Sequence, residues 1–397
     1  MNKPLLISII LLFVCSTTVF ADPYAIIHGA KAQAMGGAFD AVADDPASIY
    51  YNPAGLISLN KTNELITDFE LGNGVTFNLQ EGQCAGNYAG RTPCSKNYFK
   101  ADDIQYFLSA SYLWDKYALS IAFYNLYNII YPVTLSLQKQ SLSTGAISNA
   151  SSTSYIGQNV NILQSGFAMK PANFLSIGVT GAGVFSTFEA MSDGYIVNEF
   201  TIGVFGSVGA LAQVINNDQI KVNIGSSYRS PSAFNFPIKA VFMGASTATS
   251  YFSPQSTSIN DRFIWNIPGE FSLGTAIILT PADFTITLAG DYRYTDYNKT
   301  YLDINRPNTF NIKPVQTYSL GTEVGIFNLA LRGGFFSSQD SIKLFDTDGF
   351  TAGLGYKFGD QHIEISYKHT NYYTNTSGLS LSSQSSNTYA ASIYWVL

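Results

Sequence analysis

The sequence contains little charge. Asp, Glu, Lys and Arg make up 12% of its 397 residues, about half of the fraction that is usual in soluble proteins. The 21 basic and 27 acidic residues give a formal net charge of −6 and are spread thinly along the chain. A nucleic-acid partner is therefore not expected, because such partners are bound by clustered positive charge.

A long apolar run is also missing beyond the first residues. The mean hydropathy is +0.09, and the chain lacks the run of about 20 apolar residues that a membrane-spanning helix requires. Aromatic residues, at 14%, and the 33 glycines are by contrast abundant. Low charge, many aromatic residues and no spanning helix together indicate a transmembrane β-barrel, whose strands alternate lipid-facing and lumen-facing residues.

Cysteine is scarce, with three residues in the whole chain. Cys15 belongs to the leader described below, whereas Cys84 and Cys94 lie in one polar, glycine-rich stretch. In an oxidising compartment, Cys84 and Cys94 are expected to form a disulfide that closes a local loop. A metal or redox pair is the alternative, and the missing CxxC spacing and the lack of a nearby histidine make it the weaker one.

Histidine is scarce as well, which argues against a metal centre and against an enzyme. The three histidines share no metal-ligand spacing, so neither a metal nor a cofactor is expected: they are His28, His362 and His369. His362, Glu364 and Ser366 fall on one face of an expected strand and suggest a hydrolytic site. Such neighbours stand in a row, however, and need not converge on one atom, so no catalytic residue is expected.

Residues 1–21 are typical of a cleaved signal peptide. Lys3 provides the positive charge, residues 5–14 form a short apolar core, and residues 19–21 contain the cleavage positions. An uncleaved anchor helix is the alternative, but the apolar core is too short to span a membrane. A lipoprotein anchored at Cys15 is disfavoured because the residue before this cysteine matches lipoprotein signals poorly.

Period-two alternation dominates from residue 63 onward and is clearest at residues 284–294 and 350–358. There, large apolar residues alternate with polar or small ones, as in a strand with one face toward lipid. Short turns alternate with long polar stretches such as 131–157 and 231–264. The segments between these breaks number about fourteen, and single-chain bacterial barrels have even strand numbers.

A barrel of about fourteen strands has a lumen too wide for its own side chains to fill. Residues 22–62 precede the first strand, are rich in Ala and Gly and lack strand alternation, with turn signals at Gly36 and Gly37 and at residues 52–55. We therefore expect an all-β fold in three parts, with a signal peptide, then a hatch or plug inside the lumen, then the barrel. The expected bounds are 1–21, 22–62 and 63–397.

Several inward-facing residues are candidates for ligand contact. Phe107 and Leu113 fall on the inner face of the expected strand at 104–114, where they either line a channel or pack against the plug. Inward charges are also expected: Arg229, Arg293, Arg332, Lys357 and Lys368, with Asp291, Glu323 and Glu364. These charges either tie the wall to the plug or offer a cation to a carboxylate head group, and for the second role Arg229 is the first candidate.

Five stretches, in order, carry a family resemblance: GGAFDAVADDPASIYYNPAGL (36–56), IGSSYRSP (224–231), GEFSLGTAIILTPADFTITLAGDYRYTDYNK (269–299), LRGGFF (331–336) and GFTAGLGYKFGDQHIEISYKH (349–369). Together they resemble the FadL/TodX family of outer-membrane channels for hydrophobic compounds, over nearly the whole mature chain. The first stretch resembles the family's hatch and ends in its Asn-Pro-Ala motif. The resemblance implies that Asn52, Pro53 and Ala54, together with Gly36 and Gly37, belong to the hatch.

The resemblance implies a passive channel that takes up hydrophobic small molecules, above all long-chain fatty acids, across the outer membrane of a Gram-negative bacterium. The ligand binds among the outer loops, the hatch moves, and the ligand leaves sideways beside a kinked strand. The alternatives are a channel for aromatic hydrocarbons and a barrel that acts as a scaffold or adhesin without transport. Expected partners are the hydrophobic ligand, outer-membrane lipid and the barrel-assembly machinery, which would read the aromatic-rich last strand, and a monomer is expected.

Overall fold

The computed structural model describes most of the chain, except for both termini and several connections. The described residues are 28–59, 64–73, 76–78, 94–100, 104–140, 147–192, 195–240, 259–281, 284–296, 314–340, 346–373 and 384–396. The expected signal peptide and Cys84 lie outside these residues.

Among the described residues, three short helices come first and eighteen strands follow. The helices are α2 (Ala30–Ala34), α3 (Ser48–Tyr51) and the 3-10 helix η1 (Pro53–Ser58). The strands are β1 (Glu64–Asn73), β2 (Thr76–Asn78), β3 (Cys94–Lys100), β4 (Ile104–Trp114), β5 (Tyr117–Gln140), β6 (Ile147–Ala172), β7 (Leu175–Ser192), β8 (Tyr195–Asn216), β9 (Ile220–Arg229), β10 (Ser232–Ala240), β11 (Ile259–Ile267), β12 (Gly269–Leu279), β13 (Phe284–Asp296), β14 (Val315–Ile326), β15 (Leu329–Asp340), β16 (Asp346–Phe358), β17 (Gln361–Tyr373) and β18 (Gln384–Val396).

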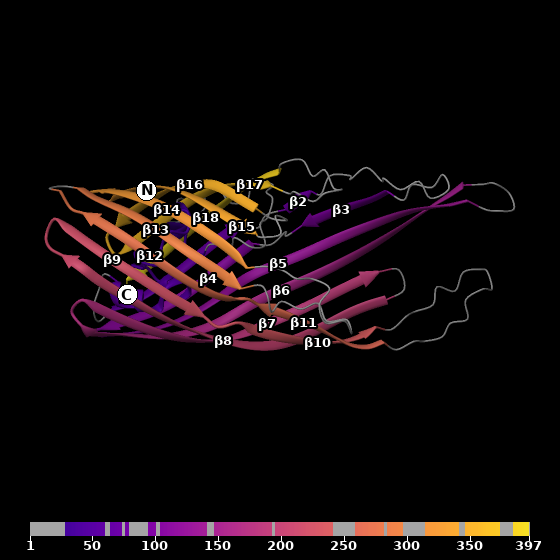
Figure 1. Ribbon diagram of the computed structural model, residues 1–397, viewed down its shortest axis with the longest axis horizontal. Helices are drawn as coiled ribbons and strands as arrows, with labels where there is room; N and C mark the ends of the chain where they lie inside the picture. Colours follow the sequence, from indigo (N-terminus) through magenta and orange to yellow (C-terminus); the bar gives the residue numbers. More distant parts are fainter. Residues whose placement is uncertain are drawn as a thin grey trace.

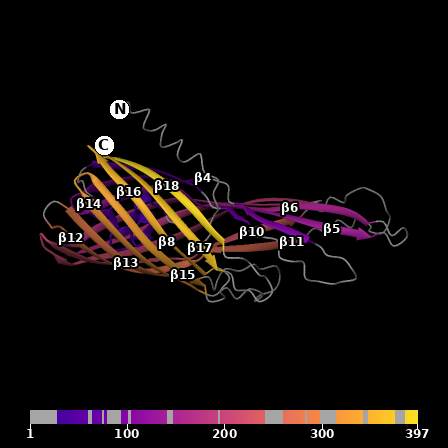
Figure 2. The same cartoon turned by 90° about the horizontal axis from the view of Figure 1, so that it is seen from above.

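Fourteen of these strands close into one antiparallel barrel. Starting from β1, each strand pairs with the next around the ring β1, β18, β17, β16, β15, β14, β13, β12, β9, β8, β7, β6, β5 and β4, and β4 pairs back to β1. The strands run obliquely to the long axis (Figures 1 and 2). The expected all-β barrel of about fourteen strands is thereby confirmed.

The two ends of the barrel differ. Tight turns join neighbouring strands at one end, on the left of Figure 1, for example at Asp115–Lys116, Phe327–Asn328 and Gly359–Asp360. We call this the short-turn end and the opposite one the long-loop end. At the long-loop end β5 and β6 extend far beyond the other strands (Figure 1).

Two stretches that the sequence indicates as loops contain strands. Within 131–157, β5 and β6 stay paired residue by residue up to Gln140 and Ile147. Within 231–264, β10 and β11 form a separate two-stranded hairpin. Polar composition was misleading in both stretches, because a ladder of backbone hydrogen bonds forms with Ser, Thr and Asn as well as with apolar residues.

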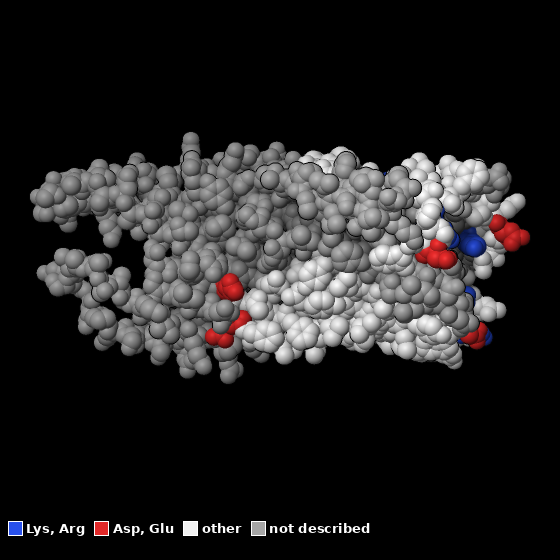
Figure 3. Space-filling model, turned by 180° about the vertical axis from the view of Figure 1, so that it is seen from behind, with Lys and Arg blue, Asp and Glu red and all other residues white. Residues whose placement is uncertain are grey.

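The outer surface of the barrel is apolar. Large hydrophobic side chains face outward on many strands, and Val204 is 73% exposed. In β13, Leu288 is 47% exposed and its neighbour Thr287 is 5% exposed, so the expected alternation is confirmed. Figure 3 shows a band of the described surface with little charge, and charged side chains gathered mainly at its edges. Such a band suits contact with lipid, because a soluble monomer rarely exposes so large an apolar area. Of the described helices, none is long and apolar enough to cross a membrane.

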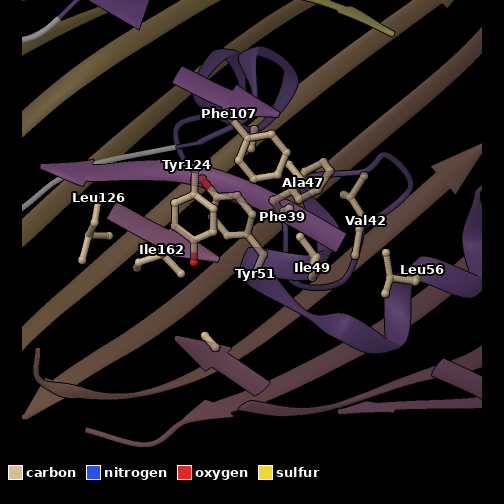
Figure 4. Packing of buried hydrophobic residues seen from close by; sticks show 14 of the residues in the cluster. Phe39, Val42, Ala47, Ile49, Tyr51, Leu56, Phe107, Tyr124, Leu126 and Ile162 are labelled. Carbon is tan, nitrogen blue, oxygen red and sulfur yellow. The ribbon is translucent and has the colours of Figure 1, made fainter. Parts of the chain in front are cut away.

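Residues 28–59, which we call the inner segment, lie inside the barrel. Gln33 donates to Thr388 of β18, whereas Asn52 donates to the carbonyl of Ala210 in β8, on the far side of the ring. The segment is almost entirely buried, and its apolar residues form one cluster with inward side chains of the wall (Figure 4). The bounds 22–62 and 63–397 stay predictions, because residues 22–27 and 60–63 lie outside the described part.

Candidate functional site

Four aromatic side chains meet between the inner segment and the wall, and we call them the ring cluster: His28, Tyr50, Phe107 and Tyr124. The His28 ring lies 4.9 Å from both the Tyr50 and the Tyr124 rings, and Phe107 stacks on Tyr124 at 5.6 Å. Phe107 and Tyr124 are cross-strand partners on β4 and β5. Tyr50 is half-buried while the other three are buried, so this ring is the most accessible member of the cluster.

His28 is neutral in this setting. Burial, followed by the nearby Arg229 cation, lowers the pKa of His28 to about 3. Its Nε2 atom is buried without a hydrogen-bond partner. The ring cluster is therefore uncharged and largely apolar, with a single unsatisfied polar atom.

A chain of ion pairs runs from the ring cluster across the wall to the inner segment. Arg229 lies 5.3 Å from the Tyr50 ring centroid and pairs with Glu270 at 3.2 Å. Glu270 also pairs with Arg293 at 3.3 Å, and Arg293 reaches Asp40 of the inner segment at 3.6 Å. The positive charge of Arg229 is therefore balanced by a wall carboxylate.

Asp291 and Asn52 fix the backbone of the inner segment. Asp291 Oδ2 accepts the N–H groups of Phe39 at 2.6 Å and Asp40 at 2.8 Å. Asn52 Nδ2 donates to the carbonyls of Asp40 at 2.8 Å and Ala210 at 3.0 Å, and Asn52 Oδ1 accepts the N–H of Ala54. The Asn52 side chain thus caps η1, and Pro53 begins that helix where a missing N–H costs nothing.

A second ionic group lies nearer the short-turn end. Lys31 pairs with Asp44 at 2.8 Å and with Glu323 of β14 at 3.4 Å. Arg332 of β15 joins Glu323 to Glu364 of β17. These contacts agree with a charge ladder between wall and inner segment, to which Arg293 and Asp291 also belong.

Lys357 departs from the expectation of an inward charge. It is exposed, because it lies at the end of β16 beside the Gly359–Asp360 turn, where the strand has passed the inner segment. Lys368 is buried as expected, with its ammonium 4.7 Å from the Phe336 ring.

The other sequence candidates divide into three groups. Gly36 and Gly37 have positive φ angles of 68° and 85°, at a turn that a side chain would strain. Leu113 is buried in the apolar cluster. Cys94 begins β3 and its side chain is not among the described ones, so the disulfide with Cys84 stays a prediction.

Sequence reasoning missed His28, Tyr50 and Glu270 as site residues. His28 carried no motif, and Tyr50 is one of two adjacent tyrosines of which either could face the lumen. Glu270 follows the alternation of β12, so its inward direction could have been found, but its partners Arg229 and Arg293 come from other strands.

The wall is irregular beside the ring cluster. One extra residue, Leu126, interrupts the pairing of β5 with β6, between the pairs Asn125↔Asn161 and Tyr127↔Val160. Asn125 Nδ2 donates to the carbonyl of Val160 at 3.3 Å and to the side chain of Asn161 at 3.1 Å. Side-chain amides therefore replace part of the regular ladder at this bulge.

Comparison with known proteins identifies the fold. Neither a family model nor a curated protein matches the sequence. Solved structures do match, among them a FadL homologue of Pseudomonas aeruginosa, with a TM-score of 0.61 and 10% identity over 96% of this chain and 98% of that chain. The toluene transporter TbuX of Ralstonia pickettii matches with a TM-score of 0.58 and 15% identity over 92% of this chain and 97% of that chain. The toluene transporter TodX of Pseudomonas putida matches with a TM-score of 0.55 and 13% identity over 93% of this chain and 98% of that chain. The chain has the fold of these proteins.

Proposed function

We propose that this chain is a FadL/TodX-type outer-membrane channel that lets hydrophobic small molecules cross passively. The observation that carries the proposal is the ring cluster, a set of aromatic contacts formed jointly by the inner segment and the wall. The shared fold and the apolar outer band support it. Proteins of the same fold include two toluene transporters and a monoaromatic hydrocarbon channel.

In this proposal the short-turn end faces the periplasm and the long-loop end faces outward, as in bacterial barrels generally. A hydrophobic molecule entering from outside reaches the inner segment at Tyr50 and is bound there by burial of its apolar surface, which is worth roughly 25 cal/mol per Å². The inner segment then acts as the hatch. The barrel-assembly machinery and the surrounding outer-membrane lipid are the proposed partners, and a monomer is the proposed state.

The bulge at Leu126 is the proposed site of sideways release. It lies next to Tyr124 on the same strand, and the local ladder depends on side-chain amides that can exchange partners. A molecule leaving the ring cluster there would enter the lipid without passing the ionic group near the short-turn end.

Two substrate classes remain to be separated. Long-chain fatty acids are the first class, with Arg229 as the partner of the fatty-acid carboxylate. That carboxylate would have to compete with Glu270 for Arg229. Neutral aromatic hydrocarbons are the second, and the balanced charge of Arg229 and the uncharged ring cluster favour them.

Uptake by intact cells tests the proposal. Cells whose only channel of this type is the protein would be given labelled oleate or labelled toluene, beside empty-vector cells and cells with Arg229→Gln. We expect uptake above the empty vector for at least one compound. Arg229→Gln should lower oleate uptake several-fold if the carboxylate binds there, and should leave toluene uptake unchanged. A folded barrel that takes up neither compound would contradict a channel and favour the scaffold or adhesin role.

A further inference from the structure

Six inward-facing glycines of the wall form three cross-strand pairs. Gly321 of β14 lies opposite Gly334 of β15, Gly225 of β9 opposite Gly274 of β12, and Gly178 of β7 opposite Gly209 of β8. Glycine weakens a strand interior, and there it often marks a close approach of another backbone. In all three pairs the inner segment supplies that backbone.

The first pair lies under Met35 and Gly36. A Cβ atom on Gly321 would be 2.6 Å from the carbonyl oxygen of Met35, and one on Gly334 would overlap the backbone nitrogen of Gly36. Real Cβ atoms essentially never show such distances. The peptide between Met35 and Gly36 therefore occupies the space that two side chains would need.

The second and third pairs repeat this arrangement. A Cβ on Gly225 would be 2.6 Å from the carbonyl carbon of Asp40. One on Gly274 would overlap the carboxylate of Asp291, which itself accepts two N–H groups of the inner segment, and would be 3.1 Å from the nitrogen of Ala41. A Cβ on Gly178 would be 2.6 Å from the nitrogen of Ala54, and one on Gly209 would overlap the Asn52 side chain and be 2.8 Å from Pro53 Cδ. The Asn-Pro-Ala motif is thus the part of the inner segment that the third pair receives.

The stretch 43–51, which we call the arm, connects the second and third pairs and is held differently. Gln164 of β6 donates to the carbonyl of Ile49 at 3.0 Å, and a Cβ on Gly166 would meet only side chains, among them Ile49 at 3.2 Å. The arm carries Tyr50 of the ring cluster. Its first residue, Ala43, has a φ of 33°, which is strained for a residue with a side chain.

We propose that the three glycine pairs are sockets that hold the inner segment in place during passage, and that only the arm moves. The inference rests on the proposed function for its role, but the seating itself does not depend on any substrate. Movement of the arm separates Tyr50 from His28 and Tyr124, and so opens a path along β4, β5 and β6 toward the bulge at Leu126. The sockets all lie outside this path, on the strands from β7 round the ring to β15.

Conductance across planar bilayers tests the sockets without a substrate. We expect Gly178→Ala to displace the inner segment and to produce a steady conductance that the unchanged protein lacks. The matched control is Gly181→Ala on the same strand, where a Cβ has no neighbour within 4 Å, and it should remain closed. Equal conductance of the two variants would overturn the proposal, provided that both barrels are folded. Folding is checked by the change of electrophoretic mobility on heating.

A compensating change separates seating from misfolding. The nearest atom to a Cβ at Gly209 belongs to the Asn52 side chain. The double variant Gly209→Ala with Asn52→Ala should therefore leak less than Gly209→Ala alone, although Asn52→Ala by itself removes hydrogen bonds. A double variant that leaks as much as the two single changes combined would show that the glycine does not act through this contact.

Hydrogen exchange of the purified protein tests the arm. Amides of residues 43–51 should exchange at least tenfold faster than those of 34–41 and 52–58. Uniform exchange over all three stretches would refute a moving arm. If the exchange pattern and the conductance results hold while cells show no uptake, the proposed function fails and the sockets stand.

Discussion

At the scale of single residues, the buried polar groups of the inner segment are arranged so that its backbone is satisfied by side chains from several elements. Asp291 of the wall accepts two of its N–H groups, and Asn52 of the segment spans two carbonyls and one N–H. Loss of one such partner leaves a buried group unsatisfied, which costs about 1–3 kcal/mol. This is why a segment with little regular structure has one defined conformation.

Asp45 gives the arm a dependence on pH. Burial, followed by the Asp44 carboxylate, raises its pKa to about 7, with Glu364 acting in the same direction and Lys31 against it. The pKa of Asp in an unfolded chain is about 4. Between these values the folded arm holds a proton that the unfolded chain lacks, so the stabilisation by this group is complete below about pH 4 and is lost as the pH rises through 7.

We therefore expect exchange protection of residues 43–51 to fall between pH 5.5 and pH 8, after correction for the intrinsic exchange rate. Asp45→Asn, which cannot ionise, should remove this dependence while keeping an acceptor for the N–H of Ala47, which Asp45 Oδ1 now binds at 2.8 Å. Protection that still falls with pH in Asp45→Asn would assign the effect to another group.

At the scale of elements, the sequence predicts the regular strands well and the irregular ones poorly. In the middle of β13 and β16 exposed and buried side chains alternate, because one face meets lipid and the other the lumen. The long β5–β6 hairpin was hidden by its serines and threonines, since only the partner strand decides that such a stretch is extended. The bulge at Leu126 depends on register and leaves no local signal.

The inner segment shows the same limit at the candidate site. Its place in the lumen follows from its composition and its position before the first strand. Its contacts do not, because the sockets combine glycines of six strands, and each glycine alone suggests only a weak strand position. Arg229 was found as an inward cation, but its balance by Glu270 requires the register of β9 with β12.

Deletion of Leu126 tests the proposed release site. The deletion restores regular pairing of β5 with β6, so we expect uptake to fall several-fold while the barrel still folds. The matched control is deletion of Val214, the extra residue of a second bulge between Gln213 and Ile215 in β8. Unchanged uptake after loss of Leu126 would place release elsewhere.

At the scale of the whole molecule, a closed ring of fourteen strands surrounds a segment that fills it near the short-turn end. Without that segment the wall would enclose a wide lumen, because its inward residues include many glycines, alanines and serines. In the wall, Glu323 would also lose its partner Lys31, and Arg293 would lose its partner Asp40.

Deletion of residues 28–59 should therefore convert the protein into an open pore. We expect a large, steady conductance in planar bilayers for the shortened chain and none for the intact one. The shortened chain must show heat-modifiable mobility, so that a folded barrel is being measured. A closed bilayer with a folded, shortened barrel would mean that other parts of the chain block the lumen.

The unequal height of the wall has a consequence for encounter. With a rise of about 3.3 Å per residue and the tilt usual in barrels, β6, with 26 residues, reaches roughly 30 Å beyond strands such as β17, with 13. Where the β5–β6 hairpin joins the barrel, β5 carries Tyr124 and β6 carries Gln164. If the proposed function holds, a molecule that adsorbs on this ribbon reaches the entrance by diffusion along a surface, which is a shorter search than diffusion through open solution.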